Sequence, residues 1–332
     1  MRKNIVFLCF ILAGLGLYSP ESQAVNCQRA STPLENTICH NSVLQWLDRT
    51  MMEIYLLMLT EGDPLKVRQT YLNWRESLRE CTSDNCIEQA YYKGISQIVD
   101  ADLAFNWQGL WWNIEAPNMS GNTIRFSRAA HWSVAVDIRA WAGMNNDEFT
   151  AEARIINGVA FVERIEDTNS CKLLMIPRKN GSLQVFSNAD WGCNISLPIG
   201  VFLDGRYQQA KSDPRPPPSL LSIGIFPTKE IDRKFRNMVG DDYQNFVNTA
   251  NVFIYEDDLD NIGAQVISMW VRGAANRRVA IIMHRPDGTM WAGRIAPDNS
   301  GKLQMHYFSS QGDDQSQMPR TLVNWRVRYL GH

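Results

Sequence analysis

The stretch CQRASTPLENTIC, residues 27–39, begins and ends with cysteine and opens the part of the chain that decides its architecture. A second close pair, Cys81 and Cys86, brackets the stretch CTSDNC further along. Close cysteine pairs serve as metal ligands, as redox couples or as disulfides. The rest of the sequence has to decide among these three roles.

The first residues indicate the cellular compartment. A positive start, Arg2 and Lys3, precedes the apolar run IVFLCFILAGLGL, and the small residues Ser22 and Ala24 occupy the positions that a signal peptidase reads. The apolar run is shorter than the ~20 residues that a membrane span needs. We therefore predict a signal peptide over residues 1–24, cleaved after Ala24, and an exported, soluble, periplasmic protein with no integral membrane segment after its removal.

An even number of cysteines remains once Cys9 leaves with the signal peptide. These are Cys27, Cys39, Cys81, Cys86, Cys171 and Cys193. An even number in an exported chain is typical of disulfides. A structural zinc site needs a second tight pair of ligands and a redox site needs CxxC, and the sequence has neither. We expect disulfides, no metal site and no cofactor.

Residues 25–103 show helical spacing of apolar residues in three runs. The runs are NSVLQWLDRTMMEIYLLMLT, EGDPLKVRQTYLNWRESLREC and NCIEQAYYKGISQIV. Asp63 can cap the second helix, and Pro64 suits its first position. Three amphipathic helices of this length bury only a small core, and small cores often need covalent staples. The segment predicts a disulfide-stapled three-helix module.

Residues 104–210 change to a period of two, with turn signals between short alternating runs. The runs are NTIRFSR, WSVAVDIRAW, FTAEARI, VAFVERI, CKLLMIP, SLQVFS and GVFLDGRYQ. This pattern predicts an antiparallel β domain, either a sandwich or a small barrel. We interpret a tryptophan cluster in this region as core and rim packing rather than a ligand cage. Its members are Trp107, Trp111, Trp112, Trp132 and Trp141.

A Pro-rich linker, KSDPRPPPS at residues 211–219, precedes an α+β domain at residues 220–332. The run TKEIDRKFRNMVG predicts a helix that stops at Gly240. Strand-like runs follow: NVFIYE, AQVISMWV, RRVAIIMH, TMWAGRIA, KLQMHYFS and LVNWRVRYL. HRPDGT predicts a hairpin turn. The fold class is therefore multidomain, α and then β.

Catalytic signatures are missing from the sequence. It contains no GxSxG, S-x-x-K or HExxH motif, and we expect no catalytic residue. A hydrolase site in the β domains would need His131, His284 or His306 to meet Asp or Glu in a cleft. The formal net charge of −2 gives no basic excess, so we expect no nucleic-acid partner.

Two acidic stretches have structural interpretations. EDDLDN places Ile262 and Met269 where an EF-hand loop needs oxygen ligands, which favours a solvated turn over a calcium site. Asp241 and Asp242 are expected to cap a short helix that contains Tyr243.

The helical segment also carries a longer pattern of spaced residues. It comprises Cys27, Ala30, Thr32, Glu35, Ile38, Cys39, Leu47, Asp48, Tyr55, Gln69, Trp74, Cys81, Cys86, Tyr91, Ile95 and Ile98. This pattern resembles the N-terminal domain of the LprI-type lysozyme inhibitor family, which is marked by C-x-x-A-x-[ST]-x-x-E-x-x-I-C, a following L-D, Q-x4-W and two close cysteines. The resemblance covers about 80 residues. Leu78 and Gly94 depart from it, because they stand where family members often carry Arg; both positions could serve packing or partner contact.

The resemblance implies the disulfides Cys27–Cys39 and Cys81–Cys86, which leaves Cys171 and Cys193 to pair within the β segment. It also implies an exported protein that binds a protein partner, with a lysozyme as the first candidate, and that acts by steric occlusion of a muramidase cleft. An envelope structural or assembly factor is the alternative, and a cell-envelope hydrolase is a less favoured one.

Overall fold

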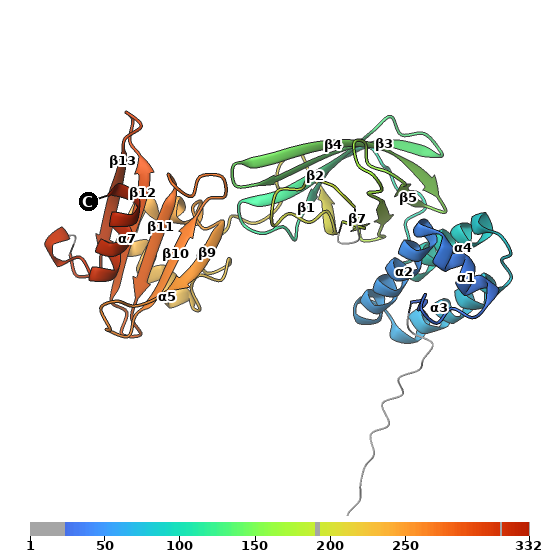
Figure 1. The fold of residues 1–332 in the computed structure, drawn as a ribbon, viewed down its shortest axis with the longest axis horizontal. Helices are drawn as coiled ribbons and strands as arrows, with labels where there is room; N and C mark the ends of the chain where they lie inside the picture. The colour runs from blue at the N-terminus through green and yellow to red at the C-terminus, as the bar shows by residue number, and fades with distance from the viewer. Residues whose placement is uncertain (1–23, 190–192, 313, 332) are drawn as a thin grey trace, which may run out of the picture. The chain divides into compact units, whose positions relative to one another are not determined.

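The computed structural model describes residues 24–189, 193–312 and 314–331 (Figure 1). The chain divides into two compact units. The first extends to Val99, and the second runs from Asp100 onward. The first unit is helical, whereas the second contains both β-rich segments.

The predicted signal peptide, apart from Ala24, lies outside the described residues. Within the described ranges, no helix combines the length and apolar character that crossing a membrane requires. The predicted end of the helical domain, at residue 103, lies close to the boundary between the two units.

Among its described residues, from Ala24 onward, the first unit contains four helices rather than the three expected. They are α1 (Pro33–His40), α2 (Ser42–Glu61), α3 (Pro64–Arg79) and α4 (Asp84–Ile98). The additional helix, α1, starts at a capping box: the Thr32 hydroxyl accepts the Glu35 N–H, and the Glu35 carboxylate accepts the Thr32 N–H. This start signal is present in the sequence as T-P-L-E, with Pro33 at the first helical position.

The other three helices begin near the predicted residues. Asp63 caps α3 by accepting the N–H groups of Leu65 and Lys66, and Pro64 is its first residue, as predicted. Asn41 caps α2 through its side-chain oxygen. The helices bury one shared set of large apolar residues, which includes Leu44, Trp46, Leu47, Met51, Ile54, Tyr71, Trp74, Ile87, Tyr91, Tyr92 and Ile95.

The first part of the second unit is a closed barrel of eight antiparallel strands in sequence order. They are β1 (Gly109–Asn113), β2 (Ser120–Ser127), β3 (Ser133–Ala142), β4 (Asn145–Ile156), β5 (Val159–Val162), β6 (Leu173–Pro177), β7 (Ser182–Ser187) and β8 (Gly205–Gln209). Strand β1 closes the barrel against β8, with Trp111 opposite Gln209. Of the two predicted architectures the barrel is correct, although the seven predicted runs omit β1.

Apolar side chains fill the barrel interior. Alternate residues of the strands point inward, as a period of two requires. The buried set includes Trp107, Trp111, Ile124, Phe126, Val136, Ile138, Val162, Leu173, Met175, Leu183, Val185 and Tyr207. Tyr207 places its hydroxyl inside this core, within hydrogen-bond distance of the Leu203 carbonyl at 2.7 Å and of the Asn122 side chain, to one of which it donates its single hydrogen. The core interpretation of the tryptophan cluster therefore holds for Trp107 and Trp111.

The Pro-rich segment at residues 211–219 forms no helix or strand, and Arg215 attaches it to the barrel. The Arg215 guanidinium donates to the carbonyls of Ala116 and Ser120, each at 2.9 Å, and pairs with Asp213 at 2.7 Å. This stretch is thus a boundary segment that Arg215, near its centre, binds to the barrel.

The last part of the second unit is a five-stranded antiparallel sheet in the order β13-β12-β11-β10-β9. The strands are β9 (Val252–Glu256), β10 (Gln265–Trp270), β11 (Val279–His284), β12 (Met290–Pro297) and β13 (Leu303–Ser309). The helical elements are α5 (Lys229–Val239), η1 (Gly240–Asp242), α6 (Tyr243–Val247), η2 (Gln315–Gln317) and α7 (Arg320–Leu330). Residues of α5 and α6 share one core with the sheet, and residues of α7 share another. The predicted helix end at Gly240 and the hairpin turn between β11 and β12 are confirmed.

The run LVNWRVRYL is a helix, α7, and its strand prediction is wrong. Leu322 and Trp325 are fully buried and stand three residues apart, which is helical spacing. Asp260 caps the helix from a distant turn by accepting the N–H groups of Arg320 and Thr321. Because Asp260 is sixty residues from the start of the helix, the sequence around α7 gives no sign of this cap.

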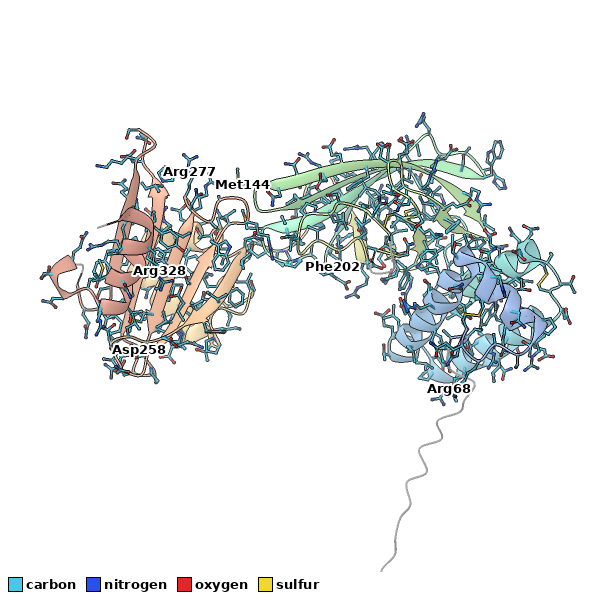
Figure 2. All side chains as sticks on the ribbon, in the orientation of Figure 1. Arg68, Met144, Phe202, Asp258, Arg277 and Arg328 are labelled. Atoms are coloured by element: carbon cyan, nitrogen blue, oxygen red, sulfur yellow. A yellow bond between two sulfur atoms is a disulfide. The ribbon has the colours of Figure 1, made fainter. Side chains whose placement is uncertain are left out.

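The acidic stretches have structural roles that differ in part from those expected. Asp258, labelled in Figure 2, accepts the N–H groups of Ile262 and Ala264, so its carboxylate organises the turn. Asp242 makes no side-chain cap to α6, contrary to expectation, and instead pairs with Arg294 at 2.7 Å. The Arg294 side chain is largely buried, and a buried guanidinium without a partner would destabilise the fold, so Asp242 is committed to this pair.

Candidate functional site

The six cysteines form the three expected disulfides, drawn as yellow bonds in Figure 2. They pair Cys27 with Cys39, Cys81 with Cys86, and Cys171 with Cys193. The first ties the chain before α1 to the end of that helix, and the second closes the turn between α3 and α4. All three therefore act as staples between neighbouring segments.

Glu35, a residue of the spaced pattern in the helical segment, binds backbone N–H groups at the start of α1. Its carboxylate accepts the N–H of Ser31 at 2.8 Å and that of Thr32 at 2.9 Å. These backbone hydrogen bonds lower the pKa of Glu35, because they favour the ionised form. The carboxylate is thus anionic at neutral pH and committed to the backbone.

Asp48 lies at the junction of α2, α4 and the segment before α1. One carboxylate oxygen accepts the Tyr91 hydroxyl at 2.7 Å, and the other accepts the backbone N–H of Val25 at 2.6 Å. Burial raises the pKa of Asp48, although these hydrogen bonds and the charge of Arg75 act to lower it. Burial and the neighbouring Asp48 also raise the pKa of Tyr91. The pair is a partly buried polar connection across the module.

Trp74 is held in place by a hydrogen bond and by a glycine. Its indole N–H donates to the carbonyl of Ala90 at 2.9 Å, and its ring lies so close to Gly94 that a Cβ there would be 2.1 Å from the ring. Leu78, one turn further along α3, is also buried. Leu78 and Gly94, the two departures from the expected pattern, thus both lie inside the packed module.

These residues surround a cleft in the helical module with a volume of about 640 Å³. The segment before α1, α1 itself, α3 and the start of α4 all contribute to its lining. The lining includes Val25, Leu34, Glu35, Thr37, Asp48, Tyr71, Trp74, Arg75, Leu78, Arg79 and Thr82. The cleft combines aromatic and aliphatic walls with a few charged groups, as ligand and partner sites commonly do.

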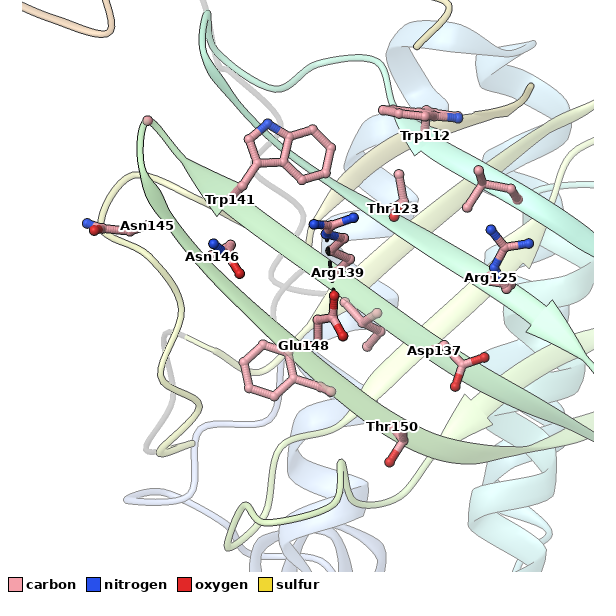
Figure 3. A pocket seen from close by; sticks show the side chains of 14 residues that line it. Trp112, Thr123, Arg125, Asp137, Arg139, Trp141, Asn145, Asn146, Glu148 and Thr150 are labelled. Carbon is pink, nitrogen blue, oxygen red and sulfur yellow. Dashed lines mark ion pairs between the residues drawn. The ribbon is translucent and has the colours of Figure 1, made fainter. Parts of the chain in front are cut away.

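A second hollow, of about 760 Å³, lies on the outer face of the barrel over β1 to β4 (Figure 3). We call it the barrel groove. It is lined by Leu110, Trp112, Thr123, Arg125, Asp137, Arg139, Trp141, Asn145, Asn146, Glu148, Phe149 and Thr150, among others. Most of these side chains alternate with core residues along their strands and so point away from the barrel interior.

Two half-buried tryptophans form a corner in the barrel groove. Trp112 and Trp141 have ring centroids 5.9 Å apart and planes at 77°. Trp141 lies across the neighbouring strand at Gly121, where a Cβ would come within 2.6 Å of the ring. Glycine at this position therefore lets the indole rest on the sheet.

Charges of opposite sign alternate along the barrel groove. Arg139 of β3 pairs with Glu148 of β4 at 3.5 Å, the dashed line in Figure 3. Arg125 of β2 stands opposite Asp137 of β3 in the strand register. All four side chains are exposed. The groove offers donors and acceptors but little net charge.

The three histidines named for a hydrolase site do not come together. His131 is exposed in the connection between β2 and β3, His284 is buried on β11, and His306 is half-buried on β13. Burial lowers the pKa of His284, whose Nε2 atom has no hydrogen-bond partner among the described residues. Across the residues that the structure describes, no group of three or more His, Cys, Asp or Glu could hold a metal ion.

The groove residues are the ones that sequence reasoning overlooked. The signal was available in GLWWN: adjacent tryptophans on a strand point to opposite faces, so one of Trp111 and Trp112 had to face outward. Treating the tryptophans as one packing cluster hides this division.

The chain was compared with protein-family models, with curated protein sequences and with solved structures, and none of the three comparisons finds a match.

Proposed function

We propose that the chain is an exported periplasmic binding protein whose helical module engages a protein partner, a lysozyme-type muramidase in the first instance, and blocks its substrate cleft by steric occlusion. The observation that carries the proposal is the cleft of the helical module, which the family-type residues surround and hold in shape. Glu35, Asp48 and Trp74 are each committed to a structural hydrogen bond at its walls.

The part of the cleft left for a partner is its outer edge. Leu34 and Thr37 of α1 are half-buried there, and Arg79 of α3, which pairs with Glu76 at 2.7 Å, is exposed. A volume of about 640 Å³ falls within the ~300–1,000 Å³ of sites that enclose a small ligand or an inserted side chain. A protruding side chain of the partner can therefore enter this cleft and be desolvated there, as interface hot spots are.

Muramidase inhibition by the full chain from residue 25 onward tests the proposal. We expect inhibition of at least one lysozyme class at micromolar concentration. The variant Leu34→Glu places a charge on the apolar wall and should weaken inhibition at least tenfold, about 1.4 kcal/mol.

Leu65→Glu is the matched control, because Leu65 lies on α3 outside the cleft and is 75% exposed. It should leave inhibition unchanged. If no lysozyme class is inhibited at micromolar concentration, the proposal fails. Recovery of envelope subunits in a pull-down would then favour the assembly-factor alternative.

The barrel groove favours a second candidate function, the binding of a neutral saccharide. Trp112 and Trp141 offer two apolar indole faces at a corner, onto which the C–H faces of sugar rings can stack. Around them, Thr123, Asn146 and the paired charges supply donors and acceptors for hydroxyl groups. The nearly balanced charge argues for a neutral ligand over an anionic one.

Calorimetric titration with chitotetraose, a soluble β-1,4-linked N-acetylglucosamine tetramer, tests this candidate. Trp141→Ala should reduce affinity at least tenfold. Trp132→Ala is the control, since Trp132 is 71% exposed and lies outside the groove. Equal affinities of the two variants would remove the groove from consideration as a saccharide site.

A further inference from the structure

Asp48 binds the backbone nitrogen of Val25, which becomes the N-terminal residue if the chain is cleaved at the predicted site. Val25 directly follows Ala24, and its backbone nitrogen lies 2.6 Å from Asp48 Oδ2. Val25 is half-buried and lines the cleft of the helical module. The other carboxylate oxygen holds the Tyr91 hydroxyl.

Cleavage changes the chemistry of this nitrogen. Hydrolysis breaks the C–N bond between Ala24 and Val25; the oxygen of the attacking water stays on the new carboxylate of Ala24, and both of its hydrogens end on the Val25 nitrogen. A signal peptidase supplies the catalyst. An α-amino group has an ordinary pKa of about 7.7–8.0, so the nitrogen is a cation at neutral pH. One neutral donor becomes an ammonium with three.

We propose that the first residue of the processed chain is Val25 and that its α-ammonium forms an ion pair with Asp48, which locks the helical module after export.

The surroundings of Asp48 make this pair effective. Desolvation by burial disfavours the carboxylate as long as its charge is incompletely neutralised. The neighbouring groups are Tyr91 from α4 and Arg75 from α3, whose charge already favours the carboxylate, and Tyr71 lies next to Tyr91. The hydrogen bond from the Val25 nitrogen to the Asp48 carboxylate is already assisted by the charge of the acceptor, and an ammonium at the same place adds the attraction between two opposite charges.

The segment that carries Val25 is short and held at both sides. Cys27, two residues further along, is bonded to Cys39. The disulfide requires an oxidising compartment, and the ammonium requires cleavage. The disulfide and the ion pair therefore both arise only at export, so the precursor in the reducing cytosol, which has at most the neutral N–H donor at Val25, has a less stable helical module than the processed protein.

The experiment uses the full chain, exported through its own signal peptide and purified by a C-terminal tag. Mass spectrometry of the N-terminal peptide should identify Val25 as the first residue. The pH profile of acylation of the α-amine then gives its pKa in the native chain. We expect a midpoint above 8 and acylation at pH 7.5 that is at least tenfold slower than in the urea-unfolded chain. Burial without an ion pair would move the midpoint in the opposite direction.

Two variants separate the ion pair from simple packing. Asp48→Asn should return the midpoint to 8 or below. A chain that retains Ala24 keeps Asp48 but moves the charge by one residue, and it should unfold at a lower urea concentration than the chain that begins at Val25. The proposal is overturned by a first residue other than Val25, by an α-amine midpoint at or below its ordinary value, or by equal urea midpoints for the two chain lengths.

Discussion

A tryptophan lies against a glycine both in the helical module and on the barrel, with different results. Trp74 packs against Gly94 inside the module, is 4% exposed and donates its indole N–H to Ala90. Trp141 lies across Gly121 on the outer barrel face and remains half-buried beside Trp112. The same pair of residue types therefore builds a core in one region and a half-buried surface corner in the other. The face on which a tryptophan lies decides whether it is structural or available to a ligand.

The largest expected effect comes from Gly94→Ala. Helix propensity alone would make this change stabilising by up to about 1 kcal/mol. The new Cβ would instead meet the Trp74 ring at 2.1 Å; overpacking typically costs about 1–3 kcal/mol, and we expect a contact this close to reach or exceed the upper end of that range. We therefore expect a lower urea midpoint for the helical unit. A stabilised variant would show that Trp74 is free to move, and the contrast with Trp141 would disappear.

Tyr91→Phe tests the polar connection in the same module. It removes the hydroxyl bound to Asp48 and should cost about 1.5–2 kcal/mol in the free energy of unfolding, because hydrogen bonds to charged groups contribute about 1.5–3 kcal/mol. Tyr92→Phe, which loses a hydrogen bond to Glu88 four residues earlier in the same helix, is the control and should cost less, because its bond does not join two helices. Equal losses would mean that the connection between α2 and α4 adds nothing.

His284 extends the comparison to a buried polar group in the C-terminal sheet. Because burial lowers its pKa in the folded state, the unfolded chain binds more protons below the ordinary value of about 6.5. Stability should therefore fall as pH is lowered through this value, by at most ~1.4 kcal/mol per pH unit. Urea unfolding between pH 5 and 7 measures the slope, and His284→Leu should flatten it. An unchanged slope would assign the pH dependence to other groups.

The smallest effect on stability is expected from Gly121→Ala. The added methyl displaces Trp141, but this ring can turn toward solvent, so the cost should stay below about 1 kcal/mol. Affinity for chitotetraose should fall nonetheless, because the corner with Trp112 is lost. A cost as large as that of Gly94→Ala would show that Trp141, like Trp74, is part of a core, and the two tryptophans would then not differ in role.

Local patterns in the sequence predict much of this fold. The start of α3 at Asp63 and Pro64, the end of α5 at Gly240 and most strands follow from capping residues and from the period of two. The prediction fails where a residue far along the chain determines the start of a helix or the partner of a side chain. Asp260 caps α7 across sixty residues, and Arg294 draws Asp242 away from α6.

The candidate sites could be predicted from the sequence less well than the fold. Motif residues such as Glu35 and Trp74 locate the helical module, but only the structure shows that they are occupied in holding it together. The barrel groove depends on which four strands lie side by side and on the outward turn of Trp112, and spacing along one strand does not reveal its neighbours.

The order of the barrel strands also has a consequence for the order in which the chain folds. Each of the strands β2 to β7 pairs with its neighbours in sequence, so hairpins can form one after another along the chain. Only the seam between β1 and β8 joins distant segments, with Trp111 opposite Gln209. Local pairing is fast and long-range closure is slow. The seam is therefore the last step, and until it forms both β1 and β8 present open edges to which a chaperone, or another unfolded chain, can add a strand.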